Sequence, residues 1–82
     1  MSNSTEDNNH VQYCSSNSVV VINPAGRLRQ VYTPFRVSQI METGRKRWLI
    51  VDEVRSTKED KLVYIINGTA YFHSHFAIDV QF

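Results

Sequence analysis

Four consecutive residues have the strongest capacity for chemistry in this sequence: Arg45-Lys46-Arg47-Trp48, three basic side chains followed by the only tryptophan. Guanidinium and ammonium groups attract phosphates, and an indole ring stacks on nucleic-acid bases or anchors a protein interface. Arg27, Arg29 and Arg36 precede this segment, and Glu42 is the only acidic residue among them. The pattern predicts a basic hairpin tip that binds a partner. The ordinary alternative is a solvated turn with Trp48 buried in the core.

The tyrosines are a second binding feature. Tyr32, Tyr64, Tyr71 and Phe72 are too many large aromatic residues for one very small core, so exposed aromatic side chains are expected. Tyrosine and arginine are both enriched where proteins bind one another. The predicted partner-binding residues are Arg27, Arg29, Tyr32, Arg36, Arg45, Lys46, Arg47, Trp48, Tyr64 and Tyr71.

The sequence contains residues typical of catalysis or metal binding, but their spacing does not bring them together in one site. His73 and His75 on a strand would project from one face, as two metal ligands could. Asp79 and Cys14 are the only obvious further ligands, and no nucleophile signature surrounds Cys14. The adjacent carboxylates at 52–53 would face opposite ways on a strand, whereas catalysis by two carboxylates needs them close together. We therefore predict no catalytic residue, metal site, cofactor or small-molecule substrate, and not an enzyme.

Length and composition predict one small domain in the cytoplasm. The chain has 82 residues, a net charge of +1 and a single cysteine, which excludes a disulfide within the chain. A lone thiol suits a reducing compartment, and the apolar runs are too short to span a membrane. Residues 1–10 are polar and lack the features of a signal peptide, so we predict a disordered tail. Residues 11–82 are expected to form the domain.

The first half of this domain reads as short strands separated by turns. Val19–Ile22 is β-branched throughout, which favours a strand. Asn23-Pro24-Ala25-Gly26 then fits a type I turn, and the alternating segment Arg27–Tyr32 completes a hairpin. Thr33-Pro34 must end or bend the strand, since proline has no N–H to donate. Phe35–Met41 is read as the next strand, although neither strand nor helix periodicity is clear there.

The second half repeats this alternation of strands and turns. After a turn at 42–44, Lys46–Val54 is rich enough in apolar residues for a central strand covered on both faces. Asn67-Gly68 is a strong signal for a type I′ hairpin, here between strands at 61–66 and 69–72. A brief turn at His73-Ser74-His75 leads to Phe76–Phe82, whose alternate apolar residues predict a final strand.

Together these segments predict an all-β fold: a small, strongly bent sheet or a barrel of five to six short strands. The layout is similar to that of SH3-like barrels, although the acidic and aromatic peptide-binding motifs of SH3 domains are missing. The predicted function is a non-catalytic module for protein–protein binding or self-assembly through an arginine- and tyrosine-rich face. The alternative is a small nucleic-acid-binding regulator that uses the basic tip Arg45–Trp48. No membrane partner is expected.

Overall fold

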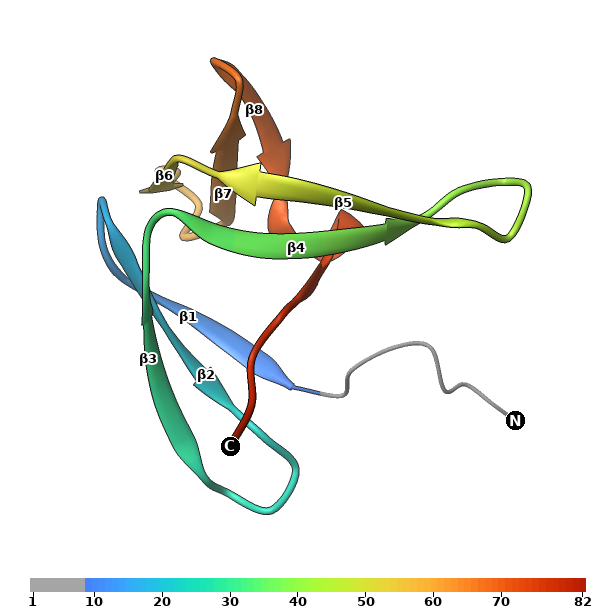
Figure 1. Ribbon diagram of the computed structural model, residues 1–82. Coiled ribbons are helices and arrows are strands. Elements are labelled where there is room, and N and C mark those ends of the chain that lie inside the picture. Colours follow the sequence, from blue (N-terminus) through green and yellow to red (C-terminus); the bar gives the residue numbers. More distant parts are fainter. Residues whose placement is uncertain (1–8) are drawn as a thin grey trace.

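The computed structural model describes residues 9–82 and shows an all-β chain with one short 3₁₀ turn (Figure 1). Most of the segment predicted to be a disordered tail lies outside the described residues, and the first strand begins at His10. The elements are β1 (His10–Ser15), β2 (Ser18–Ile22), β3 (Leu28–Tyr32), β4 (Phe35–Ile40), β5 (Lys46–Val51), β6 (Glu53–Ser56), β7 (Leu62–Ile66), β8 (Thr69–Phe72), η1 (His73–His75) and β9 (Ala77–Ile78).

These strands pair as three antiparallel three-stranded sheets, in the orders β1-β2-β3, β5-β4-β9 and β6-β7-β8. The predicted all-β class is confirmed. The prediction of one bent sheet of five to six strands is wrong, because β1 precedes the predicted strands and the segment Lys46–Val54 divides at Asp52. Each sheet keeps two terminal strands in this pairing order, which does not close into a barrel.

The first sheet confirms the predicted hairpin around the turn at 23–26. Gly26 N donates to Asn23 O at 2.9 Å, and the Asn23 side-chain oxygen accepts a hydrogen bond from Arg27 N at 2.8 Å. Gly26 has φ +85, which glycine adopts without steric cost. The central strand β2 has its Val19 and Val21 side chains fully buried, so the sheet faces the core through β2.

The second sheet centres on β4, the segment whose periodicity was ambiguous. β4 pairs with β5 along its length, from Phe35 opposite Val51 to Ile40 opposite Lys46. On its other side it pairs with β9, with Val37 opposite Ile78. The prediction of a covered central strand at Lys46–Val54 is wrong, because β5 is a terminal strand of this sheet and its outer face is exposed.

The third sheet contains the Asn67-Gly68 hairpin, which is confirmed. Asn67 and Gly68 have φ angles of 52 and 79, as a type I′ turn requires at both central positions. The turn places Ile66 opposite Thr69 and Tyr64 opposite Tyr71 in the β7–β8 pairing. The predicted brief turn at 73–75 is also present, as η1.

The C-terminal segment keeps its predicted alternation but not its predicted length. Ile78 is buried, and Phe76 and Val80 pack against the core, as the period of two requires. Only Ala77–Ile78 is a strand, whereas a strand was predicted through Phe82. The pairing with β4 continues for one hydrogen bond, from Asp79 N to Arg36 O at 2.8 Å. In this register Val80 would lie opposite Phe35, the first residue of β4, so Gln81 and Phe82 extend beyond that strand.

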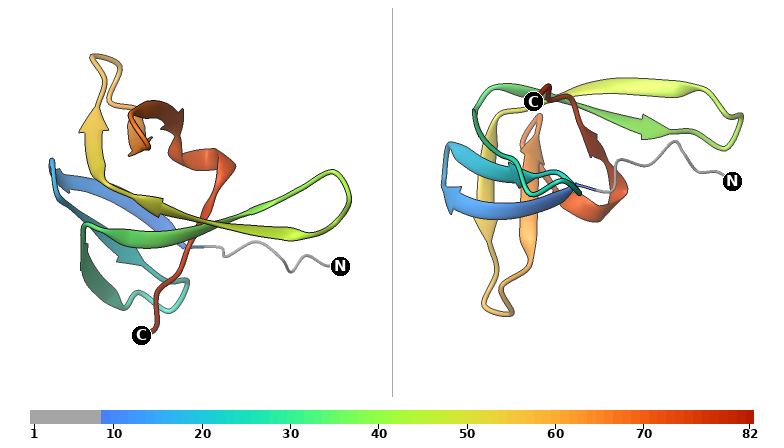
Figure 2. Two further views of the ribbon diagram at one scale, coloured as in Figure 1. Left: turned by 45° about the horizontal axis from the view of Figure 1, so that its top comes forward. Right: turned by 90° about the horizontal axis from the view of Figure 1, so that it is seen from below.

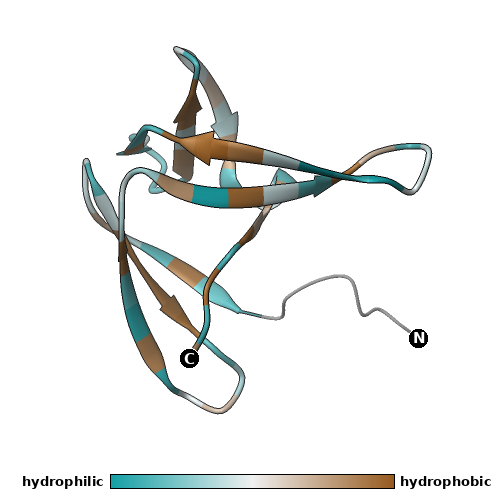
Figure 3. Cartoon of the chain, viewed as in Figure 1, coloured by the Kyte–Doolittle hydropathy of each residue, from teal (hydrophilic) through white to brown (hydrophobic). Residues whose placement is uncertain are grey.

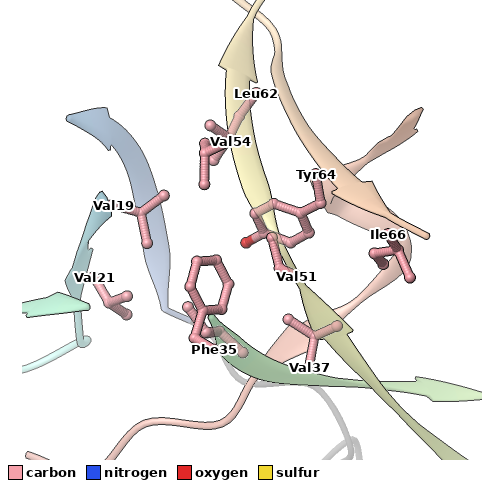
Figure 4. Packing of buried hydrophobic residues seen from close by; sticks show 10 residues of the cluster. Val19, Val21, Phe35, Val37, Val51, Val54, Leu62, Tyr64 and Ile66 are labelled. Carbon is pink, nitrogen blue, oxygen red and sulfur yellow. The ribbon is translucent and has the colours of Figure 1, made fainter. Parts of the chain in front are cut away.

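All three sheets contribute to a single core (Figure 4). Tyr64 lies within it with only 1% of its surface exposed, and its ring meets the Phe35 ring edge-on at 5.5 Å between centroids. Three hairpins, β2–β3, β4–β5 and β7–β8, extend from this core in different directions (Figures 1 and 2). The buried residues of this core cluster are Val19, Val21, Phe35, Val37, Val51, Val54, Leu62, Tyr64, Ile66 and Ile78.

Candidate interaction surface

The β4–β5 hairpin has one face toward the core and one toward solvent. Because side chains alternate along a strand, the residues that alternate with buried Phe35, Val37 and Val51 project from the outer face. Hydropathy changes along β5, from hydrophobic near its end to hydrophilic toward the turn (Figure 3). We call the exposed outer residues of this hairpin the Trp48 face: Arg36, Ile40, Lys46, Trp48 and Ile50.

Trp48 lies at the centre of this face with 47% of its surface exposed. The Arg36 Cζ atom lies 4.4 Å from the centroid of the indole ring, and Lys46 Nζ lies 5.3 Å from it. The strand register puts Arg36 opposite Ile50 and Lys46 two residues before Trp48, so the two cations flank the indole along the strand direction. Both are within the range of cation–π attraction, which holds the indole in place.

Asp79 fixes the Arg36 guanidinium over the indole. Its Oδ2 atom accepts a hydrogen bond from Arg36 Nε at 3.0 Å and forms an ion pair with Arg36 Nη2 at 2.8 Å. The Asp79 backbone N–H also donates to Arg36 O. An ion pair as exposed as this one contributes little stability, so its main consequence is orientation. The sequence indicates Asp79 only as a candidate metal ligand, because 43 residues separate it from Arg36.

The predicted basic tip is present at the β4–β5 turn. Gly44 N donates to Met41 O at 2.9 Å, and this closes the turn before Arg45. Arg45, Lys46 and Arg47 are all exposed, and in residues 9–82 none of them forms an ion pair. Arg47 lies opposite Gln39, on the other side of the hairpin from Trp48. The three cations therefore do not share one face.

The predicted binding residues do not form a single surface. Arg27, Arg29 and Tyr32 belong to the β2–β3 hairpin, whose turn lies at a different end of the molecule from the β4–β5 turn (Figures 1 and 2). The structure brings together only Arg36, Lys46 and Trp48 of the predicted set. Arg45 and Arg47 lie next to them along the chain.

Two predicted tyrosines occupy other environments. Tyr64 was expected at the surface and is instead a core residue, surrounded by the rings of Phe35, His73 and Phe76. Tyr64 lies on β7, the central strand of its sheet, and its side chain faces the core together with Leu62 and Ile66. Tyr71 on β8 is 38% exposed and contacts the Phe76 ring.

Two exposed residues of the Trp48 face were missed. Ile40 and Ile50 are each 49% exposed and border the Trp48 and Lys46 positions. Ile50 lies two residues after Trp48, which places both side chains on the same face of a strand. That spacing was a usable signal, but the segment was read as covered on both faces.

The residues considered for catalysis or metal binding make other contacts in the structure. His73 and His75 are in η1, not on a strand, and their rings contact Tyr64 and Phe76 respectively. Exposed Cys14 has Gln30 Nε2 at 3.4 Å from its sulfur atom. Across the part of the chain that the structure describes, no group of three or more histidine, cysteine, aspartate or glutamate residues could hold a metal ion.

The chain matches no protein-family model, no curated protein and no solved structure. Within residues 9–82, no helix is long and apolar enough to cross a membrane. Function must therefore be argued from the exposed surfaces themselves. Among these, the Trp48 face combines an exposed aromatic ring, exposed aliphatic side chains and cations in contact with the ring.

Proposed function

We propose that this chain is a non-catalytic interaction module whose protein partner binds the Trp48 face. The observation that carries the proposal is the half-exposed indole of Trp48 with the Arg36 guanidinium 4.4 Å from its ring centroid. Tryptophan and arginine are the residues most enriched among those that dominate binding energy at protein interfaces. Ile40 and Ile50 supply neighbouring apolar surface that a partner would remove from water.

The charge of the hairpin indicates what kind of partner fits. Lys46 lies on the Trp48 face, and Arg45 lies beside it at the turn, both without a carboxylate partner in residues 9–82. A partner surface that carries acidic residues around an apolar centre would complement this arrangement. Such complementarity mainly accelerates association and excludes basic competitors.

Cys14 bears on where the module acts. It is exposed, and it is the only cysteine, so it has no partner for a disulfide within the chain. An exposed free thiol persists in a reducing compartment. We therefore place the module in the cytoplasm.

Trp48→Ala is expected to weaken partner binding at least about 30-fold, which corresponds to about 2 kcal/mol. A photo-cross-linking amino acid at Ile50 would first trap the partner in cells, with the same amino acid at exposed Thr69 on β8 as the positional control. Calorimetry with the purified partner then compares the native chain, Trp48→Ala and the control Tyr71→Ala, which lies on a different hairpin. Equal affinity of the native chain and Trp48→Ala would contradict the proposal.

Nucleic acid is the second candidate, because the indole is exposed beside cations rather than buried. On the β4–β5 hairpin, the cations without a carboxylate partner among residues 9–82 are Arg45, Lys46 and Arg47, and Arg47 projects from the opposite side. Such a small charge gives a weak electrostatic term, which scales with the number of phosphates contacted. We expect Trp48 fluorescence to remain unchanged when mixed-sequence DNA or RNA is added at physiological salt. Quenching that weakens steeply with salt would favour nucleic acid over protein.

A further inference from the structure

The outer edge of β3 presents unpaired backbone groups. Among residues 9–82, β3 is a terminal strand of its sheet, and Figure 1 shows no strand beyond it. Backbone hydrogen bonds from Asn23 N to Arg27 O at 3.0 Å and from Thr33 N to Asn17 O at 2.9 Å mark the hydrogen-bonded positions of the β2–β3 pairing. Because such positions alternate, Arg29 and Val31 face β2. The backbone N–H and C=O groups of the intervening residues, Leu28, Gln30 and Tyr32, point away from the sheet.

The side chains along this edge provide little protection against pairing with another strand. Natural edge strands are commonly shielded by charges, prolines or bulges. The three residues whose backbone groups point outward are uncharged, Arg29 is the one charged residue of β3, and the β2–β3 register contains no bulge. Leu28 and Tyr32 are 66% and 62% exposed, more than any other large hydrophobic residue described. By contrast, β5, another terminal strand, begins with two consecutive basic residues, Lys46 and Arg47.

We propose that β3 pairs antiparallel with β3 of a second copy of this chain, about a two-fold axis at Gln30. In that register Gln30 meets Gln30 of the other copy, and Leu28 meets Tyr32 in both directions. These pairs use the unpaired backbone groups, and each exchanges both N–H···O=C bonds. The three-stranded sheets of two copies thereby join into one continuous sheet.

The charged residue of β3 does not oppose the proposed register. Arg29 lies opposite Val31 of the other copy, so no like charges face each other directly. The two Arg29 side chains are diagonal neighbours at about 7–8 Å, a distance at which they still repel one another weakly in dilute salt. Added salt should therefore strengthen this dimer, whereas it should weaken binding of any acidic partner to the Trp48 face.

Charge variants at Gln30 test the two-fold register. Gln30→Lys or Gln30→Glu would place like charges directly opposite each other, while a mixture of the two variants would pair unlike charges. Gln30 is exposed and its side-chain hydrogen bonds to Cys14 and Ser18 are both 3.4 Å long, so each monomer should stay folded. Gln12→Lys, on the same sheet but on β1, is the matched control.

Sedimentation of the full chain between about 1 µM and 1 mM should show a dimer with a dissociation constant on the order of 100 µM, typical of a small interface. Each Gln30 variant alone should be at least tenfold weaker, and their mixture should recover the dimer. Amide NMR signals of Leu28, Gln30 and Tyr32 should shift with concentration more than those of Arg29 and Val31. A chain that stays monomeric, a dimer unaffected by both variants, or shifts centred on β5 or β8 would each overturn the proposal.

Discussion

Tyr64→Ala is expected to lose about 3–5 kcal/mol of folding free energy, the range for truncating a large buried aromatic residue. Tyr64 is 1% exposed, and its ring contacts Phe35, Phe76 and His73, so the variant would leave a cavity where the three sheets meet. A chain of 82 residues has a stability of about 4–12 kcal/mol. The loss therefore removes a large part of the total. Thermal unfolding followed by circular dichroism should show a Tm at least about 12 °C lower.

Two companion variants distinguish cavity formation from other effects. Tyr13→Ala removes the same atoms at a residue that is 44% exposed, and it should cost less than about 1 kcal/mol. Tyr64→Phe keeps the ring and removes only the hydroxyl group, with an expected cost of about 1 kcal/mol. Similar Tm values for Tyr64→Ala and Tyr13→Ala would show that Tyr64 is not the centre of the core.

The turns were the part of the fold most accessible from sequence. Asn67-Gly68 and the turn at 23–26 adopt the predicted conformations because their constraints are local. Positive φ at Asn67 and Gly68 and the side-chain hydrogen bond of Asn23 depend on residues within one turn. Strands adjoining such turns were consequently placed to within a few residues.

The coverage of each strand face was much harder to predict. The apolar run from Trp48 to Val51 is compatible with a strand buried on both faces, which is the prediction from sequence. Whether the second face is covered depends on segments far away in the chain. Here β9 pairs with the other edge of β4, and no element of residues 9–82 covers Trp48 and Ile50. The same difficulty applies to Tyr64, since composition shows how many tyrosines exist and not which one the sheets enclose.

The candidate surface shows a related limit. Arg36, Lys46 and Trp48 could be identified by residue type, and the structure places them together. The sequence could not show that β2–β3 and β4–β5 extend in different directions, which separates Arg27, Arg29 and Tyr32 from them. Nor could it show that Asp79 holds Arg36. The Arg36–Asp79 contact depends on the pairing of β9 with β4, two strands that are far apart in the chain.

The Trp48 face and the core belong to the same short strand, so stability and binding can be separated at adjacent residues. Val51 is fully buried, whereas Ile50 is 49% exposed on the opposite face of β5. Val51→Asp would put a carboxylate among apolar side chains, which costs several kcal/mol in addition to the lost burial of valine, about 1.5–3 kcal/mol. This total is comparable with the whole stability of the chain. We expect no cooperative unfolding transition at neutral pH.

Ile50→Asp introduces the same carboxylate one residue earlier, with a very different expected result. Position 50 is solvated and lies opposite Arg36, so the cost should stay within about 1 kcal/mol and the Tm should change little. Binding of an acidic, apolar-centred partner should nevertheless weaken at least about tenfold, because the variant removes apolar contact and adds a repelling charge. Calorimetry with the cross-linked partner, once purified, measures this directly.

If Ile50→Asp folded and bound as tightly as the native chain, the Trp48 face would not be the binding surface. If Val51→Asp folded normally, the two faces of β5 would be wrongly assigned. The pair therefore tests separately which side of one strand stabilises the fold and which side meets the partner.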